Sequence, residues 1–257
     1  MMLPEHRVHS LRYATLPGRT RGENFVQTAE PATPMPMDYF VWLVDGPAGP
    51  LLVDTGFSRE VGERRGRTML ADLPDLLRRV DVDPMALTDV VLTHLHYDHA
   101  GNLGLFPNAT FHVQASELAF ATGPLMRYAF FGAPFEAADL DRLREAGEQG
   151  RVHLVDGKHT LRDGVELHRV GGHTGGTQVV RVHTARGWLV LASDALHYTE
   201  NRTTRSPFPL VVDAAEMFAG YELCEQLADA DDLIVPGHDP ALAEAGTPVT
   251  AGVRRLV

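Results

Sequence analysis

The segment 93–99 carries the densest group of metal-binding side chains in the sequence. It reads Thr-His-Leu-His-Tyr-Asp-His and follows a short apolar run that predicts a buried strand. Alternate side chains in the turn after a strand can point the same way, so His94 and His96 can bind one ion. The chain then turns into a helix, where Asp98 and His99 face a second ion. Imidazole and carboxylate at this density favour Zn²⁺, or alternatively Fe, Mn or Co, over Ca²⁺ and Mg²⁺.

Three more candidate ligands lie in tight loops at the ends of strands predicted in the second half. They are His173 in GGHTGG, Asp194 in LASDA and His238 in VPGHD. Strand-end loops are where α/β folds place functional groups, and two ions need more ligands than one segment offers. A carboxylate at Asp194 can bridge two ions about 3.5–4 Å apart. The predicted metal ligands are His94, His96, Asp98, His99, His173, Asp194 and His238.

The chain contains 13 histidines, and not all of them are candidate ligands. Five do not lie in strand-end loops, so we interpret them as surface or core residues: His112, His153, His159, His168 and His183. Asp54, in the motif VDTG, is predicted to be structural. It would cap the backbone of the metal-binding segment or orient one of its histidines.

Composition excludes several classes of protein. With 44% hydrophobic and 22% charged residues, the 257-residue chain is not disordered. Its net charge of −11 disfavours nucleic acid and anionic membranes as partners. A single cysteine, Cys224, excludes an intrachain disulfide framework and a cysteine metal cluster. No apolar run approaches the ~18 residues of a membrane span, and the first ten residues lack a signal-peptide core, so we expect a cytoplasmic protein.

Short apolar runs separated by turn residues predict many strands and a few helices. The runs on either side of Gly-Pro-Ala-Gly (46–49) predict a hairpin, and helices are expected over 69–80, 115–148 and 214–229. Residues 1–37 and the tail from Ala241 carry weak signals. The similar segments PLLVDTG and WLVLASDA hint at a duplicated sheet–helix unit. We therefore expect one domain, 1–257, of two packed sheets with helices outside.

The order of these motifs resembles the metallo-β-lactamase superfamily. The resemblance covers about 37–240 and rests on LLVDTG, THLHYDHAGN, GGHTGG, SDA and GHD. It implies an α/β fold, a four-layer αβ/βα sandwich with two mixed sheets and outer helices, and a dinuclear site at one sheet edge. By position, the first metal would be bound by His94, His96 and His173. The second would be bound by Asp98, His99 and His238, with Asp194 bridging.

Within the superfamily, the sequence is most similar to the N-acyl homoserine lactonases and related lactonases. The resemblance rests on the ligand set without cysteine, on HAGN after the metal loop and on DALHYTEN over 194–201. The sequence departs from the lactonases in two places. Where they have a catalytic Tyr, three residues after the bridging Asp, this chain has His197, with Tyr198 next. Thr177 replaces the second His of their PGHSxGH loop.

The resemblance implies hydrolysis of a lactone by a hydroxide that bridges two divalent metals. Either His197 or Tyr198 would donate a hydrogen bond to the carbonyl or to the developing oxyanion. Either Asp98 or Asp194 would pass a proton to the leaving alkoxide. The partner is then a small-molecule substrate, and we expect part of it to be apolar.

The segment 115–150 includes the aromatic and Met-containing stretch 120–135. We interpret it either as a lid or wall that favours an apolar substrate, or as an interface, for example of a homodimer. Arg202 and Arg205 follow the Asp194 loop. Solvated surface residues are the favoured interpretation for both, and recognition of a substrate carboxylate is the alternative.

Several other functions compete with lactone hydrolysis. A thioesterase resembling glyoxalase II would use basic residues near the C-terminus, where this chain has only Arg254 and Arg255. Other ester or amide hydrolases of the superfamily are further alternatives. The charge of −11 argues against a phosphodiesterase acting on nucleic acid, and the complete ligand set argues against a non-catalytic metal-binding module. β-Lactamases with a Cys ligand are disfavoured because Cys224 lies in a predicted helix.

Overall fold

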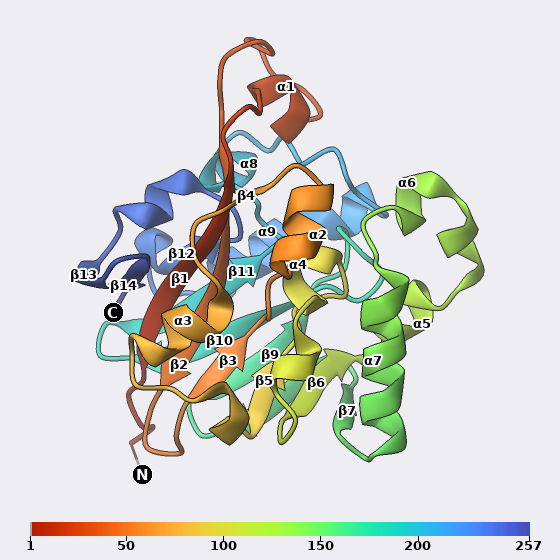
Figure 1. Cartoon of the computed structure of the whole chain (residues 1–257). Coiled ribbons are helices and arrows are strands. Elements are labelled where there is room, and N and C mark those ends of the chain that lie inside the picture. Colours follow the sequence, from red (N-terminus) through yellow and green to blue (C-terminus); the bar gives the residue numbers. More distant parts are fainter. Residues whose placement is uncertain (1) are drawn as a thin grey trace.

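The computed structural model describes residues 2–257 and is built on two β-sheets (Figure 1). The strands of the larger sheet are β1 (Arg7–Leu16), β2 (Met37–Asp45), β3 (Leu51–Val53), β4 (Thr68–Met69), β5 (Asp89–Val91), β6 (Thr110–Gln114), β7 (Val152–Val155), β13 (Thr247–Thr250) and β14 (Val253–Arg255). The strands of the smaller sheet are β8 (Lys158–Arg162), β9 (Val165–Arg169), β10 (Gln178–Thr184), β11 (Gly187–Ser193) and β12 (Ile234–Pro236).

Both sheets are mixed. The larger sheet has the order β13-β14-β1-β2-β3-β5-β6-β7, with β4 paired to β1, and the smaller has the order β12-β11-β10-β9-β8. The neighbours β3, β5, β6 and β7 run parallel, as do β11 and β12, whereas the other pairs are antiparallel. Parallel strands place their carboxyl ends on one edge of a sheet, which is where loops can bring ligands together.

Helices cover the outer face of each sheet (Figure 1). Their bounds are α1 (Arg21–Asn24), α2 (Arg59–Arg64), α3 (Leu73–Arg78), α4 (Tyr97–Ala100), α5 (Ala115–Ala121), α6 (Ala129–Gly132), α7 (Ala137–Glu148), α8 (Thr199–Thr203) and α9 (Ala214–Leu227). Leu76 of α3 and Leu143 of α7 pack on the larger sheet, and Tyr221 of α9 packs on the smaller one. Within residues 2–257, no helix combines the length and apolarity needed to cross a bilayer.

Strand β2 shows how the layers are held together. All its residues from Met37 to Val44 are buried. Phe40, Trp42 and Val44 join the core between the two sheets, whereas Tyr39, Val41 and Leu43 join the core beneath the helices. The alternation follows from the two-residue period of a strand, and a strand covered on both faces is apolar throughout. The layers are helix, sheet, sheet and helix, so the expected αβ/βα sandwich is confirmed.

The structure contains strands in the segments that carried weak signals. β1 lies within 1–37, and β13 and β14 form a hairpin beyond Ala241. The register of β1 against β2 shifts between Arg12 and Ala14, and this irregularity breaks the alternation that would reveal a strand. The hairpin is partly polar because β13 lies at the edge of the sheet. β4 and β8 are further strands that the sequence did not predict.

Two predicted helices are shorter than expected. The helix expected over 69–80 begins only at Leu73, because Pro74 fits the first turn of a helix but not its interior. The segment 115–148 is helical but divided, and the break contains Gly123 and Pro124. The helix expected over 214–229 is present as α9.

Two strands, one in each sheet, end in a left-handed backbone conformation. The residue after β3 is Asp54, with φ +64°, and the last residue of β11 is Ser193, with φ +45°. Non-glycine residues rarely adopt this conformation, so the surrounding structure must hold it. The segments that resembled each other in sequence are these two strands. An aspartate directly follows each strand, Asp54 after β3 and Asp194 after β11.

Glu117 of α5 ties the metal-binding segment to the GGHTGG loop. Its buried carboxylate accepts hydrogen bonds from Leu95 N (2.9 Å), Gly176 N (2.9 Å) and Thr174 Oγ1 (2.5 Å). Burial raises the pKa of this carboxyl, against the effect of the three donors. Thr177 Oγ1 also accepts from Thr174 N (3.0 Å), so the residue that replaces the second His of the lactonase motif holds the loop.

Substituting Glu117→Ala is expected to lower the free energy of unfolding by about 3 kcal/mol or more, because three buried donors lose their acceptor. The midpoint of urea unfolding measures the loss. Glu148→Ala, which removes an exposed carboxylate of α7, is the matched control and should leave the midpoint unchanged. Equal midpoints for the two variants would contradict this role of Glu117.

Candidate metal centre

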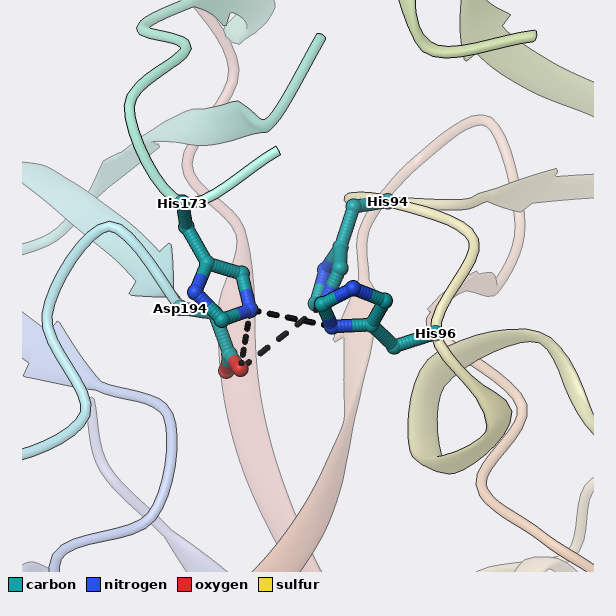
Figure 2. Close-up of side chains that lie close together, drawn as sticks. All are labelled: His94, His96, His173 and Asp194. Carbon is teal, nitrogen blue, oxygen red and sulfur yellow. Dashed lines mark hydrogen bonds and ion pairs between the residues drawn. The ribbon is translucent and has the colours of Figure 1, made fainter. Parts of the chain in front are cut away.

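The structure brings together all seven predicted ligands, which come from four separate segments of the chain. One group consists of His94, His96, His173 and Asp194, and a second of Asp98, His99 and His238. Within each group, one potential ligand atom from every residue lies within 4.8 Å of the others. Figure 2 shows His173 and Asp194 facing His94 and His96 across the first group. All seven side chains are buried.

Asp194 lies between the two groups. Its Oδ2 is 3.2 Å from His173 Nε2 and 3.7 Å from His94 Nε2. Its Oδ1 is 2.9 Å from His238 Nε2 and 3.3 Å from His99 Nε2. Because each carboxylate oxygen faces a different group of histidines, the side chain has the orientation that a bridging ligand needs.

The outer nitrogens of several imidazoles are held by hydrogen bonds. His173 Nδ1 donates to the carbonyl of Leu210 and His238 Nδ1 to that of Asp38, both at 2.8 Å. His99 Nδ1 contacts Asp54 Oδ2 at 2.7 Å. An imidazole that donates through one nitrogen presents the lone pair of the other, so these contacts fix Nε2 as the atom available to a metal.

Asp54 performs both of the structural roles predicted for it. Besides orienting His99, its carboxylate accepts hydrogen bonds from the backbone N of Thr93 (2.7 Å) and from Thr93 Oγ1 (2.8 Å). The left-handed backbone at Asp54 therefore directs a carboxylate under the start of the metal-binding segment. The two loops that follow β3 and β5 are thereby fixed to each other.

The chemistry of the cluster fits divalent metal ions. Nε2 of His94 and Nε2 of His99 are buried and have no hydrogen-bond partner among residues 2–257. Such unpaired atoms are rare in folded proteins because each costs about 1–3 kcal/mol. Burial lowers the pKa of His94 and His96 well below the usual value, which keeps these imidazoles in the neutral form that binds metals.

The charge on Asp194 is stabilised by its neighbours. Burial alone would raise the pKa of this carboxyl, but attraction to His197, His238 and His99 outweighs burial and holds the pKa well below its usual range. The buried carboxylate is therefore ionised at neutral pH, as a metal ligand must be.

The structure separates the two candidates for contact with substrate. His197 faces the centre, with Nε2 3.0 Å from Asp194 Oδ2, and its ring stacks on Phe208 with 3.7 Å between centroids. Burial lowers the pKa of His197 to about 3. Tyr198 is buried elsewhere, and its hydroxyl donates to the carbonyl of Pro36 at 3.2 Å. His197 lines the cavity described below, whereas Tyr198, with its hydroxyl bonded to Pro36, does not.

A cavity of about 200 Å³ opens beside the cluster. Its lining includes Asp98 and His197 and several residues that the sequence analysis did not single out: Arg19, Met37, Tyr39, Arg65, Arg67 and Phe208. Arg19 and Met37 come from parts of the chain before and at the start of β2. No spacing pattern marks these residues, because packing of the N-terminal segment over the site brings them there.

Other residues considered for the site lie elsewhere. From the aromatic stretch 120–135, only Ala133 and Pro134 line the cavity. Tyr128 and Phe130 are exposed, and Phe135 packs edge-on against His96. The aromatic residues of this stretch are therefore absent from the cavity lining, although Phe135 packs on one of the clustered histidines.

The remaining arginines and histidines have other partners. Arg202 pairs with Glu225 and Asp231, Arg205 also pairs with Glu225, and Arg254 donates to backbone carbonyls. None of these three arginines lines the cavity. His112 is interpreted as non-ligating. It lies on β6, away from the cluster, and contacts Asp89 of β5 and His153 of β7.

Comparisons of the sequence with known proteins agree with the geometry. The sequence model of the Metallo-beta-lactamase superfamily matches residues 35–238. An N-acyl homoserine lactonase of a Bacillus species is 25% identical over 82% of this chain and 85% of its own length. The lactonase AiiA of Bacillus thuringiensis subsp. kurstaki is 28% identical over 77% and 81%. A "probable metallo-hydrolase" of Mycobacterium tuberculosis is 29% identical over 79% and 74%.

Solved structures share the fold. An N-acyl homoserine lactone hydrolase, with N-hexanoyl-L-homoserine bound at its catalytic metal centre, aligns with a TM-score of 0.76 at 21% identity, covering 95% of this chain and 96% of that one. The dizinc quorum-quenching lactonase AidC aligns with a TM-score of 0.74 at 20% identity, covering 93% and 90%. Because the superfamily model matches most of its length, the chain belongs to the metallo-β-lactamase superfamily and is a metallo-hydrolase related to the N-acyl homoserine lactonases.

Proposed function

We propose that this protein opens a lactone ring by hydrolysis and uses two divalent metal ions, with Zn²⁺ as the first candidate. The observation that carries the proposal is the position of Asp194, whose two oxygens face separate groups of histidines. The likeness to lactonases supports the choice of ester bond. The proposed ligands are His94, His96 and His173 for one ion, and Asp98, His99 and His238 for the other, with Asp194 shared.

Metal ions bound at this centre would polarise the scissile carbonyl and lower the pKa of water to about 7. The side chains then have separate tasks. His197, on the cavity side of Asp194, donates a hydrogen bond to the carbonyl oxygen as negative charge develops there. Asp98 lines the cavity and carries a proton to the leaving alkoxide. Water forms a new bond to the carbonyl carbon, the ring C–O bond breaks, and the proton lost by that water passes through Asp98 to the alkoxide, which gives a hydroxy acid.

The segment 115–150 is proposed to form one wall of this site within a single domain. Ala133 and Pro134 line the cavity, and the carbonyl of Pro134 accepts a hydrogen bond from Tyr97 N at 2.9 Å. This bond fixes the wall to α4, which carries Asp98. Movement of the wall would therefore be transmitted to a residue of the reaction centre.

Purified protein is expected to contain about two metal ions per chain and to hydrolyse lactones. Metal analysis and a panel of acyl-homoserine, γ-butyro- and aromatic lactones test this, with β-lactams and S-lactoylglutathione as controls. A chelator should abolish turnover, and Zn²⁺ should restore it. Hydrolysis of the thioester without hydrolysis of any lactone would replace this proposal with the thioesterase alternative.

Asp98→Asn should reduce kcat by about 10²-fold or more, because the amide cannot carry the proton and is a poor metal ligand. Circular dichroism should show the fold unchanged. Asp75→Asn, in an exposed part of α3, is the matched control and should retain activity. Undiminished kcat in Asp98→Asn would show that the proposed mechanism is wrong.

His197→Ala and Tyr198→Phe should affect different properties, the first catalysis and the second stability. The first should lower kcat by about 10²–10³-fold, as expected for loss of a donor to the oxyanion. The second should leave kcat unchanged and cost about 1 kcal/mol of stability, because only the bond to Pro36 is lost. Steady-state kinetics and urea unfolding of both variants provide the measurement. A large loss of kcat in Tyr198→Phe alone would reverse the assignment.

A further inference from the structure

The cavity beside the metal centre is lined by three arginines in a chain whose net charge is −11. Arg65 is paired with the carboxylate of Glu136 at 2.7 Å. The hydrogen bonds that Arg19 and Arg67 donate instead go to uncharged atoms. Two guanidinium groups at the cavity are therefore held in place while their charge is not neutralised by these partners.

Arg67 is held from one side. Its Nε donates to the hydroxyl of Tyr97 (3.0 Å) and its Nη1 to the carbonyl of Arg65 (2.7 Å). The guanidinium also lies near the rings of Tyr39 and Tyr97, at 5.9 and 5.8 Å from their centroids. Its Nη2 donates no hydrogen bond to residues 2–257, so this end of the group is available to a ligand.

Arg19 lies on the side of the cavity that contains His197. Its Nε donates to Asn24 Oδ1 (2.6 Å) and its Nη2 to the carbonyl of Glu23 (2.5 Å). The guanidinium carbon is 5.2 Å from the centroid of Phe208, and the same ring stacks on His197. Arg19 is thereby positioned next to a group that faces the reaction centre.

Positive charge fixed at a cavity favours an anionic ligand. Guanidinium groups bind carboxylate and phosphate through charge-assisted hydrogen bonds, and a preorganised guanidinium loses little freedom when it does so. Asp98 and Asp194 are the carboxylates in the lining, and metal ions bound by them would offset their negative charge. Met37, Phe208 and Leu210 supply apolar surface beside these charges.

We propose that the substrate is a compact lactone that carries a second, anionic group, a carboxylate or a phosphate, which Arg19 and Arg67 bind. This inference rests on the proposed lactone hydrolysis and narrows its substrate class. An N-acyl homoserine lactone has no charged group, so the preferred substrate differs in charge from that of the related lactonases.

The kinetic test compares γ-carboxy-γ-butyrolactone with its uncharged carboxamide. The carboxylate is expected to have a kcat/KM about tenfold higher or more, mainly through a lower KM. The phosphate ester of γ-hydroxymethyl-γ-butyrolactone, compared with the free alcohol, shows whether phosphate is preferred to carboxylate. Equal kcat/KM for the charged and uncharged members of both pairs would overturn the inference and leave lactone hydrolysis standing.

Variants assign the preference to the two arginines. Arg19→Gln and Arg67→Gln should each reduce the ratio of kcat/KM between charged and uncharged members, and the double variant should abolish it. Arg67→Lys keeps a charge without the planar fork and should keep part of the ratio. Arg144→Gln removes an exposed arginine of α7 and is the matched control, with an unchanged ratio. An unchanged ratio in the double variant would contradict the assignment.

A binding experiment separates this inference from the proposed function. Calorimetry of the protein as purified compares α-hydroxyglutarate, which has two carboxylates, with γ-hydroxybutyrate, which has one. The dissociation constant should be about tenfold lower for the dicarboxylate, and this advantage should disappear in the double variant. If no lactone is hydrolysed and the advantage is still present, the anion site stands and only the proposed reaction fails. Equal affinities would argue against the anion site itself.

Discussion

The centre depends on one buried carboxylate that faces imidazoles on both sides. A carboxylate removed from water is costly unless charges or hydrogen bonds compensate it. Asp194 is compensated by histidines that follow strands of both sheets, so neither sheet alone could hold it. The packing of the two sheets is therefore a condition for the chemistry, and the chemistry explains why so many polar side chains are tolerated at this edge of an apolar core.

Contacts away from the centre set the directions of the ligands. Asp54 binds both His99 and the backbone at Thr93, and Glu117 joins the metal-binding segment to the loop of His173. Carbonyls of Leu210 and Asp38 orient two further imidazoles. These contacts hold the outer nitrogens of the imidazoles and direct the inner nitrogens at the centre. The ligands are therefore oriented before a metal binds.

How well each part of the site could be predicted from sequence depended on how far apart its residues lie along the chain. His94, His96, Asp98 and His99 are close in sequence, and His173, Asp194 and His238 follow recognisable strands. Local patterns were therefore enough to predict two packed sheets and to single out the side chains that the structure brings together, whereas the αβ/βα arrangement was predicted from the family resemblance. β1 was missed because a bulge disturbs its alternation. Arg19, Arg67 and the aromatic stretch 120–135 could not be placed, because tertiary packing alone decides which of their side chains face the cavity.

Arg19 lines the cavity but lies outside the part of the chain that the superfamily model matches. It precedes residues 35–238, over which the superfamily model matches, whereas all seven ligands lie within that range. Part of the cavity is thus built by a segment that lies outside the range over which the family model matches. A match to the superfamily model therefore does not by itself fix the charge that lines this cavity.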